Sequence, residues 1–437
     1  MSSSPSSRRV LVLGAYGLIG SNVARRLRNE GYAVTGLGRK PEARSVLPDL
    51  NWVFHDLRAL QECENWRSII DRFDVVVNCA GALQTGGEDD LLAVHYHAIA
   101  ALAAACREAG IGVVQVSAVG ASGDAASAFM RSKSAGDTAL RNSGAKHWIF
   151  RPGLVLAPSA YGGTVLIRML AAVPIVQPLA FAEARICTVG VDEIAGAVVL
   201  ALRDQLPDGL VCDLIEDEPN TLKGIVAAHR QWLGFAPARY ELSIPPWMLW
   251  PITAAADLLG ILGWKSPLRS TAISVLRGGI VGSTEAWYSA GGHRAASLSQ
   301  TLARMPAGPE DRLTARLSLL TPIILTVLFA FWIVSGTIGL WRIETATQIL
   351  VHAGWSREIS WVSVSFWSII DILIALALAV RSTAQRACWA MVIVCTIYLV
   401  SATLITPHLW LDPLGPLIKI LPVMLLALVA RSLLETR

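Results

Sequence analysis

The segment from residue 10 to residue 27 constrains the fold of this chain more than any other part of its sequence. It begins with four consecutive apolar residues, a pattern that indicates a buried parallel strand because both faces of such a strand are covered. Gly14, Gly17 and Gly20 come next, and a helix-compatible segment follows without a break. A strand, a glycine-rich turn and a helix in this order are typical of a site for the phosphates of a dinucleotide. An ordinary glycine-rich turn is the alternative.

Each glycine of this turn has a physical task. Gly14 lets the strand turn tightly, Gly17 lets backbone N–H groups approach a pyrophosphate, and Gly20 lets the helix lie close to its strand. The helix N-terminus adds N–H groups and a positive dipole end. The predicted phosphate-binding residues are Gly14, Ala15, Tyr16, Gly17, Leu18, Ile19 and Gly20.

Strand and helix patterns alternate as far as residue 151. The expected strands are residues 10–13, 33–37, 52–55, 75–79, 112–117 and 146–151, and the clearest helical patterns are 89–108 and 127–142. This alternation predicts an α/β fold: a Rossmann-like, doubly wound parallel sheet, with ligand at the carboxyl ends of the strands. Residues 152–302 have a looser pattern and are expected to form mainly a small cap, which completes a domain over residues 8–302.

The C-terminal part of the chain is far more apolar than the rest. A mean hydropathy of +0.50 and a charged fraction of 16% are unusual for a soluble protein, and the excess lies after Arg312. Four apolar stretches each approach the ~20 residues that cross a ~30 Å hydrocarbon core: residues 317–340, 361–380, 387–405 and 417–434. We expect a linker at 303–312 and an all-α four-helix transmembrane bundle at 313–437. Residues 1–7 lack an apolar run and are expected to be a disordered tail.

Arginines are distributed unevenly between the two sides of these predicted spans. One side holds Arg304, Arg312, Arg316, Arg381, Arg386, Arg431 and Arg437. The other side holds Arg342 and Arg357, with Lys419 near a span end. The positive-inside rule therefore places the N-terminal domain and the C-terminus in the cytoplasm, as in a multi-pass protein of a bacterial-type inner membrane.

Charge and cysteine usage argue against several kinds of partner. A net charge of +4, with no basic run among aromatic residues, argues against nucleic acid. The seven cysteines form no C-x-x-C pair and have no metal-ligand spacing, so we expect reduced core thiols and no metal site.

Two short tryptophan-bearing segments, residues 244–251 and 254–264, are apolar but too short to cross a membrane. Pro251 and Asp257 interrupt them. They are expected either to pack on the cap or to dip into the bilayer interface.

The end of the second strand predicts which dinucleotide binds. Sites that prefer NAD place an acidic residue there for the ribose 2′-hydroxyl, but this chain has Arg39 and Lys40. A cationic pair suits a 2′-phosphate, so the sequence favours NADP. A solvated basic turn is the alternative.

Several motifs between residues 8 and 302 together resemble the atypical or extended short-chain dehydrogenase/reductases, near the group that contains the nucleotide-binding accessory subunit of respiratory complex I. The motifs are the glycine turn, His55-Asp56-Leu57, Asn78-Cys79-Ala80-Gly81, residues 116–120, Ser132-Lys133, Arg151-Pro152-Gly153 and Val191-Asp192-Glu193. The resemblance implies that Asp56 and Leu57 flank the adenine, and that Asn78, Ala80 and Gly81 line the ribose and nicotinamide. It also implies that Ser117 bonds a substrate carbonyl and that Lys133 holds the nicotinamide ribose.

The chain departs from this family at the proton donor. The family has a tyrosine four residues before the lysine, and this chain has Phe129, which carries no exchangeable proton. Two functions follow: an oxidoreductase or epimerase-like enzyme acting on a lipid-like or quinone-like substrate, with Tyr96 or Tyr161 as a substitute donor, or a catalytically silent sensor or assembly module of a membrane complex. A small-solute transporter is less favoured, because four short helices leave little room for a pathway.

Residues 316–437 resemble the DoxX-like four-helix membrane family, members of which are linked to quinone and redox processes. The resemblance rests on residues 331–336, on Asp371, on residues 406–416 and on Lys419. Asp371 lies near the middle of a span and is expected to face the bundle interior, in a functional or a structural role. The non-cytoplasmic ends of the last two spans are expected to hold a cluster that forms either a small polar site or an interfacial anchor: His408, Trp410, Asp412 and Lys419.

Overall fold

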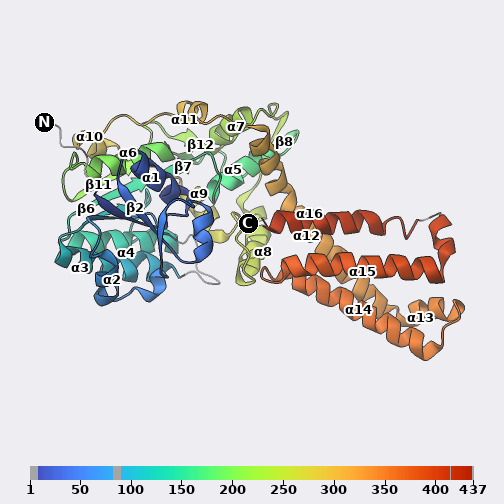
Figure 1. Ribbon diagram of the computed structural model, residues 1–437. Coiled ribbons are helices and arrows are strands. Elements are labelled where there is room, and N and C mark those ends of the chain that lie inside the picture. Colours follow the sequence, from blue (N-terminus) through green and yellow to red (C-terminus); the bar gives the residue numbers. More distant parts are fainter. Residues whose placement is uncertain (1–7, 82–89, 414, 436–437) are drawn as a thin grey trace. The chain divides into compact units, whose positions relative to one another are not determined.

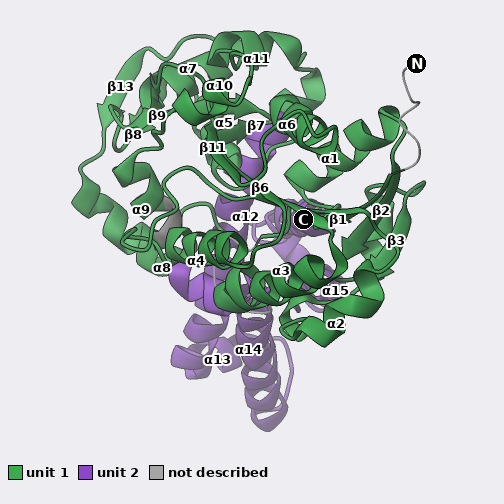
Figure 2. Ribbon diagram, turned by 90° about the vertical axis from the view of Figure 1, so that its left-hand side faces the viewer, with its two compact units in different colours: residues 1–256, 266–312 green, residues 257–265, 313–437 purple. Residues whose placement is uncertain are grey.

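The computed structural model describes residues 8–81, 90–413 and 415–435, so the predicted tail lies outside the described residues (Figure 1). The chain divides into two compact units, which Figure 2 colours separately. Unit 1 comprises Met1–Ala256 and Ser266–Arg312, and unit 2 comprises Asp257–Lys265 and Leu313–Arg437.

Unit 1 is built on a seven-stranded parallel sheet, which confirms the predicted α/β class. Its strands are β1 (Arg9–Leu13), β2 (Ala33–Gly38), β3 (Asn51–Phe54), β4 (Val75–Asn78), β5 (Gly112–Val116), β6 (His147–Pro152) and β11 (Leu210–Leu214). The order is β11-β6-β5-β4-β1-β2-β3, so the direction of winding reverses between β1 and β4. A ligand of such a sheet binds at this switch point, beyond the carboxyl ends of the strands.

Helices cover both faces of this sheet (Figure 1). They include α1 (Leu18–Asn29) and α6 (Val191–Leu202) on one face, and α2 (Cys63–Ile70), α3 (Ala98–Ala109) and α4 (Ala128–Asn142) on the other. Successive residues of a strand point to opposite faces. Val10 and Val12 accordingly join the core beneath α1 and α6, while Leu11 and Leu13 join the core beneath α2 and α3. The apolar run of β1, residues 10–13, is therefore required by burial on both sides.

The segment predicted as cap contributes to the main sheet as well as to smaller elements. Its strand β11 pairs with β6, with Val211 opposite Ile149. The other elements are β7 (Leu154–Leu156), α5 (Gly163–Ala172), β8 (Val176–Leu179), β9 (Arg185–Ile186), β10 (Thr188–Gly190), β12 (Asn220–Thr221), α7 (Leu222–Trp232), β13 (Tyr240–Ser243), α8 (Leu249–Ile261), α9 (Ser270–Gly278), α10 (Glu285–Ser289) and α11 (Leu298–Arg304). Three small two-stranded sheets, β7 with β10, β8 with β13 and β9 with β12, hold the excursion together.

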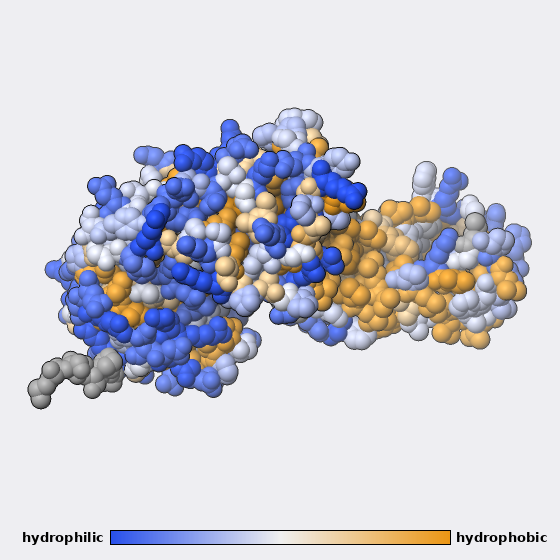
Figure 3. Space-filling model, turned by 90° about the horizontal axis from the view of Figure 1, so that it is seen from above, coloured by the Kyte–Doolittle hydropathy of each residue, from blue (hydrophilic) through white to orange (hydrophobic). Residues whose placement is uncertain are grey.

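Unit 2 is helical, with α12 (Pro309–Trp341), α13 (Ile343–His352), α14 (Arg357–Ala379), α15 (Ala384–Ile405) and α16 (Ile420–Glu435). Among the described residues, three helices are long and apolar enough to cross a membrane: α12, α14 and α15. The fourth predicted span forms α16, which has 16 residues. Large apolar side chains cover the surface of this unit, which is mostly orange in Figure 3. Such a surface suits lipid and not water.

The helix α12 begins inside the stretch predicted as linker. Pro309 stands at its first position, where a missing N–H costs nothing, and Glu310 and Asp311 lie in its first turn. These are helix-start signals, and they account for helical structure ahead of the apolar run.

Candidate functional site

The glycine turn between β1 and α1 has the tight geometry that its sequence predicts. Gly14 has a φ of +67°, a conformation that favours glycine. A Cβ on Gly20 would lie 2.2 Å from the carbonyl oxygen of Gly14, so α1 approaches the turn as closely as a glycine allows. A Cβ on Gly14 would lie 2.8 Å from Cα of Ala80, which places the end of β4 against the turn. The turn and the loop after β4 therefore form one continuous backbone surface.

The N-terminus of α1 is suited to an anion. Gly17 is its N-cap and offers no side-chain hydrogen bond, and no acidic residue lies in the first turn. The first N–H groups of a helix lack intrahelical partners and carry the positive end of its dipole. The N–H of Gly17 donates to the carbonyl oxygen of Gly14 at 2.9 Å, so the groups that fit a pyrophosphate are the N–H groups of Leu18 and Ile19, two of the residues that the sequence predicts.

The predicted adenine-side residues follow β2 and β3. Arg39 and Lys40 come directly after the last residue of β2, and Asp56 lies two residues beyond the end of β3. Hydrogen bonds from Arg58, at 2.6 Å from Nη2 and 3.0 Å from the backbone N–H, are the largest cause that lowers the pKa of Asp56, and Arg39 adds to it. Asp56 is therefore an ionised carboxylate whose orientation Arg58 fixes. Leu57 is buried beside it.

The loop after β4 carries the predicted nicotinamide-side residues. The Asn78 side chain is buried and donates to Oε1 of Gln115 at 2.7 Å. Its own Oδ1 accepts the N–H of Ala80 at 3.0 Å. Asn78 therefore shapes the loop, and the loop itself presents Ala80 and Gly81.

Lys133 lies below this loop, on the inward face of α4. Its Nζ donates to the carbonyl oxygen of Val116 at 3.2 Å and lies 3.4 Å from the position of a Cβ on Gly81. Burial lowers the pKa of the Lys133 ammonium, and the nearby Asp137 carboxylate offsets part of this effect. A buried ammonium of lowered pKa is a stronger acid than an ordinary lysine.

Ser117 is held by Asp137, a residue outside the motifs that the sequence predicts for the site. Its hydroxyl donates to Oδ2 of Asp137 at 2.8 Å, and Arg151 donates to the same oxygen from Nε and Nη2, both at 3.0 Å. Oδ1 of Asp137 is buried with no hydrogen-bond partner among the described atoms. Burial is the largest cause that raises the pKa of Asp137, against the influence of Arg151. Asp137 follows Lys133 by one turn of α4, and this spacing is the sequence signal that could have indicated Asp137 as a site residue.

The position of the missing tyrosine is packed against a histidine. The rings of Phe129 and His95 meet edge to face, with centroids 5.6 Å apart. His95 lies in the π-helical turn η3 (Ala93–His97), and such turns recur at functional sites. Its Nε2 lies 3.4 Å from the position of a Cβ on Gly81, the same distance as Nζ of Lys133. The structure thus brings Phe129, His95 and Lys133 to one side of the Gly81 loop.

The hydrogen bonds of Ser132 define the tautomer of His95. The Ser132 hydroxyl donates to the carbonyl oxygen of Phe129 at 2.8 Å, so it can only accept from Nδ1 of His95, also at 2.8 Å. Burial, with a smaller contribution from Lys133, lowers the pKa of His95 well below its usual value. The ring is therefore neutral, with its proton on Nδ1 and an acceptor lone pair on Nε2.

The two tyrosines considered as substitute proton donors have other surroundings than Ser117 and Lys133. Tyr96 packs against His97 with ring centroids 4.8 Å apart, and Tyr161 is 54% exposed ahead of α5. Among the hydrogen bonds described for the chain, none joins either ring to Ser117 or Lys133. These hydrogen bonds therefore give no support to Tyr96 or Tyr161 as a replacement for the proton donor missing at Phe129.

Unit 2 has a polar cluster of its own. Asp371 on α14 is buried and accepts hydrogen bonds from Ser335 on α12 at 2.8 Å and from Tyr398 on α15 at 2.9 Å. A Cβ on Gly336 would lie 2.5 Å from the carbonyl oxygen of Ser368, so α12 and α14 touch beside this cluster. Asp371 therefore links three helices in the bundle interior. In the segment between α15 and α16, the indole N–H of Trp410 donates to the hydroxyl of Thr403 at 3.0 Å.

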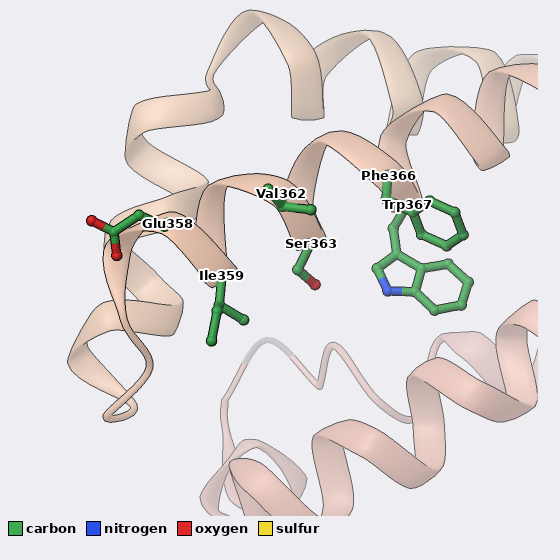
Figure 4. Close-up of a pocket in the computed structure, with 6 residues that line it drawn as sticks. All are labelled: Glu358, Ile359, Val362, Ser363, Phe366 and Trp367. Atoms are coloured by element: carbon green, nitrogen blue, oxygen red, sulfur yellow. The ribbon is translucent and has the colours of Figure 1, made fainter.

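A shallow hollow of about 410 Å³ lies along α14 (Figure 4). Its lining residues are Glu358, Ile359, Val362, Ser363, Phe366 and Trp367. All belong to α14, a helix that is long and apolar enough to cross a membrane, so the hollow is an open apolar surface of that helix and not an enclosed site. Among the described residues, no group of three or more metal-ligating side chains is gathered in one place.

Comparisons with known proteins identify two regions. Residues 10–173 match the NAD dependent epimerase/dehydratase family, and residues 329–428 match the DoxX-like family. Similar solved structures include the Bordetella bronchiseptica enzyme WbmG in complex with NAD, at 16% identity and a TM-score of 0.53, covering 70% of this chain and 94% of that one. Another is the enzyme WbmH of the same organism in complex with NAD+, at 18% identity and a TM-score of 0.51, covering 69% of this chain and 97% of that one.

A third similar structure is the Escherichia coli NADPH-dependent quinone oxidoreductase QOR2 complexed with NADPH, at 17% identity and a TM-score of 0.51, covering 68% of this chain and 99% of that one. Identities this low show a shared fold alone. No curated protein sequence matches the chain.

Proposed function

Because residues 10–173 form an NAD-dependent epimerase/dehydratase-type domain and residues 329–428 a DoxX-like domain, we propose that this protein is a membrane-anchored oxidoreductase that uses a nicotinamide dinucleotide. Dinucleotide binding rests on the turn Gly14–Gly20, on the uncapped N-terminus of α1, and on the contact of Gly14 with Ala80. The pyrophosphate would lie on the first turn of α1, the adenine near Asp56 and Leu57, and the nicotinamide near Ala80 and Gly81.

We further propose that the dinucleotide is NADP. Arg39 and Lys40 directly follow β2 and place two cations where an NAD site has an acid. The distribution of arginines favours a cytoplasmic position for the N-terminal domain in a bacterial-type inner membrane. A substrate of lipid-like or quinone-like chemistry is consistent with a redox domain that shares its chain with membrane helices.

The proton for reduction would come from Lys133. A reduced nicotinamide, when bound, supplies hydride to the substrate carbon. The substrate oxygen then needs a proton, which Phe129 cannot give and which the neutral His95 does not carry on Nε2. Nζ of Lys133 is the charged donor beside the Gly81 loop, and burial strengthens it as an acid. Solvent would return the proton to the lysine after each turnover. The place of Lys133 beside Gly81 is the observation that carries this proposal.

A catalytically silent dinucleotide sensor or assembly module is the second candidate. Two observations favour it: the phenyl ring at Phe129, and the Ser117 hydroxyl, whose proton is donated to Asp137. Ser117 would have to leave Asp137 before it could donate to a substrate carbonyl. In this case the dinucleotide would regulate the protein or its complex without being oxidised.

Binding and turnover, measured separately, distinguish the two candidates. The full chain, reconstituted in liposomes, is titrated with NADPH and NADH, and NADPH oxidation is followed with quinone and ketone acceptors. If the protein is an oxidoreductase, we expect NADPH oxidation by the native chain and none by Lys133→Met. The affinity of this variant for NADPH should stay within about ten-fold of the native value. Tight binding with no oxidation above background for any acceptor would establish the silent module.

The variant Phe129→Tyr is the matched control. It restores the family's phenol one helical turn from Lys133. Activity that appears only in this variant means that the native site has lost turnover. Equal activity in both proteins means that a phenol was never needed.

A further inference from the structure

The helix α8 and the short turn before it expose an unusual number of large apolar side chains. Trp247 is 75% exposed, Trp250 is 74% exposed, Leu258 is 62% exposed and Ile261 is 77% exposed. The only charged residue within α8 is Asp257. Soluble proteins rarely leave adjoining tryptophans and leucines in water, and such a patch marks an interaction site.

The packed side of α8 is narrow and made of small residues. Ala256 and Gly260, one helical turn apart, are buried, whereas Ile252 and Leu259 are exposed. A helix that packs through a stripe of small residues leaves its larger apolar surface uncovered, and such a surface is expected to bind a further partner. Among the known kinds of partner, the lipid interface accommodates this arrangement of tryptophan and leucine.

The C-terminal end of α8 is fixed to the membrane helices. Residues 257–265 belong to unit 2, and Figure 2 draws them in its colour. The indole N–H of Trp264 donates to the carbonyl oxygen of Ala379 at 2.6 Å, and the N–H of Arg381 donates to Leu262 at 3.0 Å. The guanidinium of Arg381 lies over the Trp264 ring, 5.6 Å from its centroid, which is within the ~6 Å of a cation–π contact.

These contacts fix the depth of α8. Ala379 is the last residue of α14, and α15 begins at Ala384 after a short turn. Both helices are long and apolar enough to span a membrane, so their connecting turn lies at one bilayer surface. A helix whose end is hydrogen-bonded to that turn lies at the level of the lipid headgroups.

We propose that α8 is an interfacial helix, lying in the bilayer surface with Trp247, Trp250, Leu258 and Ile261 among the lipids. Tryptophan prefers this level, because its ring is apolar and its N–H is polar. The occupant of the exposed face is phospholipid, since the helix continues directly into contacts with the spanning helices. Of the two roles that the sequence leaves open for residues 244–264, the structure assigns the interfacial one. The proposal rests on the membrane anchoring in the proposed function and not on its catalysis.

The test uses the full chain in liposomes that contain a phospholipid with a photoactivatable acyl chain. After irradiation, labelled peptides are mapped by mass spectrometry. We expect labelling over residues 244–261 as well as in α14, and none above background in α2, the matched helix of unit 1. In the triple variant Trp247→Gln, Trp250→Gln, Leu258→Gln, labelling of α8 is lost while labelling of α14 stays unchanged.

Each other outcome contradicts the proposal in a recognisable way. Labelling of α14 with α8 at the level of α2 would show that the exposed face does not meet lipid. Cross-links between the α8 segments of two chains would show that a second copy covers it. Absence of label from α14 as well would overturn membrane anchoring itself, and this result is separate from any measurement of NADPH oxidation.

Discussion

The substitution Gly20→Ala tests whether close contact between α1 and the glycine turn creates the dinucleotide site. The added Cβ would lie 2.2 Å from the carbonyl oxygen of Gly14, 2.9 Å from its carbonyl carbon and 3.0 Å from Cα of Ala15. All three are backbone atoms, so no side chain can turn away. The helix must move off the turn by about 1 Å, and overpacking of this kind costs about 1–3 kcal/mol.

Alanine also has a favourable effect, because it is a better helix former than glycine by about 1 kcal/mol. The net destabilisation expected for Gly20→Ala relative to the native protein is therefore about 0–2 kcal/mol, which corresponds to a Tm lower by up to roughly 8 °C. Since the N–H groups of α1 move with the helix, NADPH affinity should fall about ten-fold, equivalent to about 1.4 kcal/mol.

The matched control is Gly196→Ala in α6, where a Cβ would meet no atom within 4 Å. Only the helix-propensity effect acts there, so this variant should be as stable as the native protein or slightly more so. The assay is thermal unfolding of the full chain in detergent, following the transition that NADPH raises, together with an NADPH titration. The reasoning is refuted if Gly20→Ala matches Gly196→Ala in both Tm and affinity.

Three further predictions concern other parts of the molecule. Arg39→Ser should weaken NADPH binding by about ten-fold or more and leave NADH binding unchanged, since a charge-assisted hydrogen bond contributes about 1.5–3 kcal/mol; equal loss for both dinucleotides in a titration would contradict the NADP assignment. Burial lowers the pKa of His229 to about 4, so the unfolded chain binds a proton that the folded chain does not, and stability should decrease as pH falls from about 6.5 toward 4. In His229→Leu, thermal unfolding across this range should depend less steeply on pH, and an unchanged slope would assign the dependence to other groups. Tyr398→Phe removes one hydrogen bond to Asp371 and should lower the Tm of unit 2 by an amount equivalent to about 1–3 kcal/mol, whereas the exposed Thr396→Val serves as the control; equal Tm values for the two variants would mean that the cluster does not stabilise the bundle.

The sequence predicts the main sheet well because the signals are local. Six strands are short apolar runs bounded by turns, and each appears in the structure within one or two residues of its expected bounds. The seventh strand, β11, was not predicted. Its five residues include Asp213, whose carboxylate accepts the N–H of Ser283 at 3.1 Å, so the apolar run is broken by a residue with a tertiary partner.

The site is predictable only where backbone geometry defines it. The glycine turn is a local feature, and its conformation follows from residues 14–20. By contrast, the hydrogen bonds around Ser117 and the packing of Phe129 join segments that meet only in the folded chain. Asp137 accepts from Ser117 and from Arg151, and His95 packs against Phe129. Sequence spacing gives a weak signal for Asp137, one turn after Lys133, and none for His95.

Different residues of the candidate site would bind a dinucleotide and carry out chemistry with it. The features that favour binding, Gly14, Gly20 and Ala80, depend on backbone alone and tolerate loss of the family's phenol. The features that would carry catalysis depend on where the protons lie. The hydroxyl proton of Ser117 is donated to Asp137, and the Nδ1 proton of His95 is donated to Ser132. Both of these protons are already donated to groups of the protein. Among the described residues, Lys133 places ammonium protons beside the Gly81 loop, so under the proposed function turnover depends on whether this side chain can release a proton and regain it.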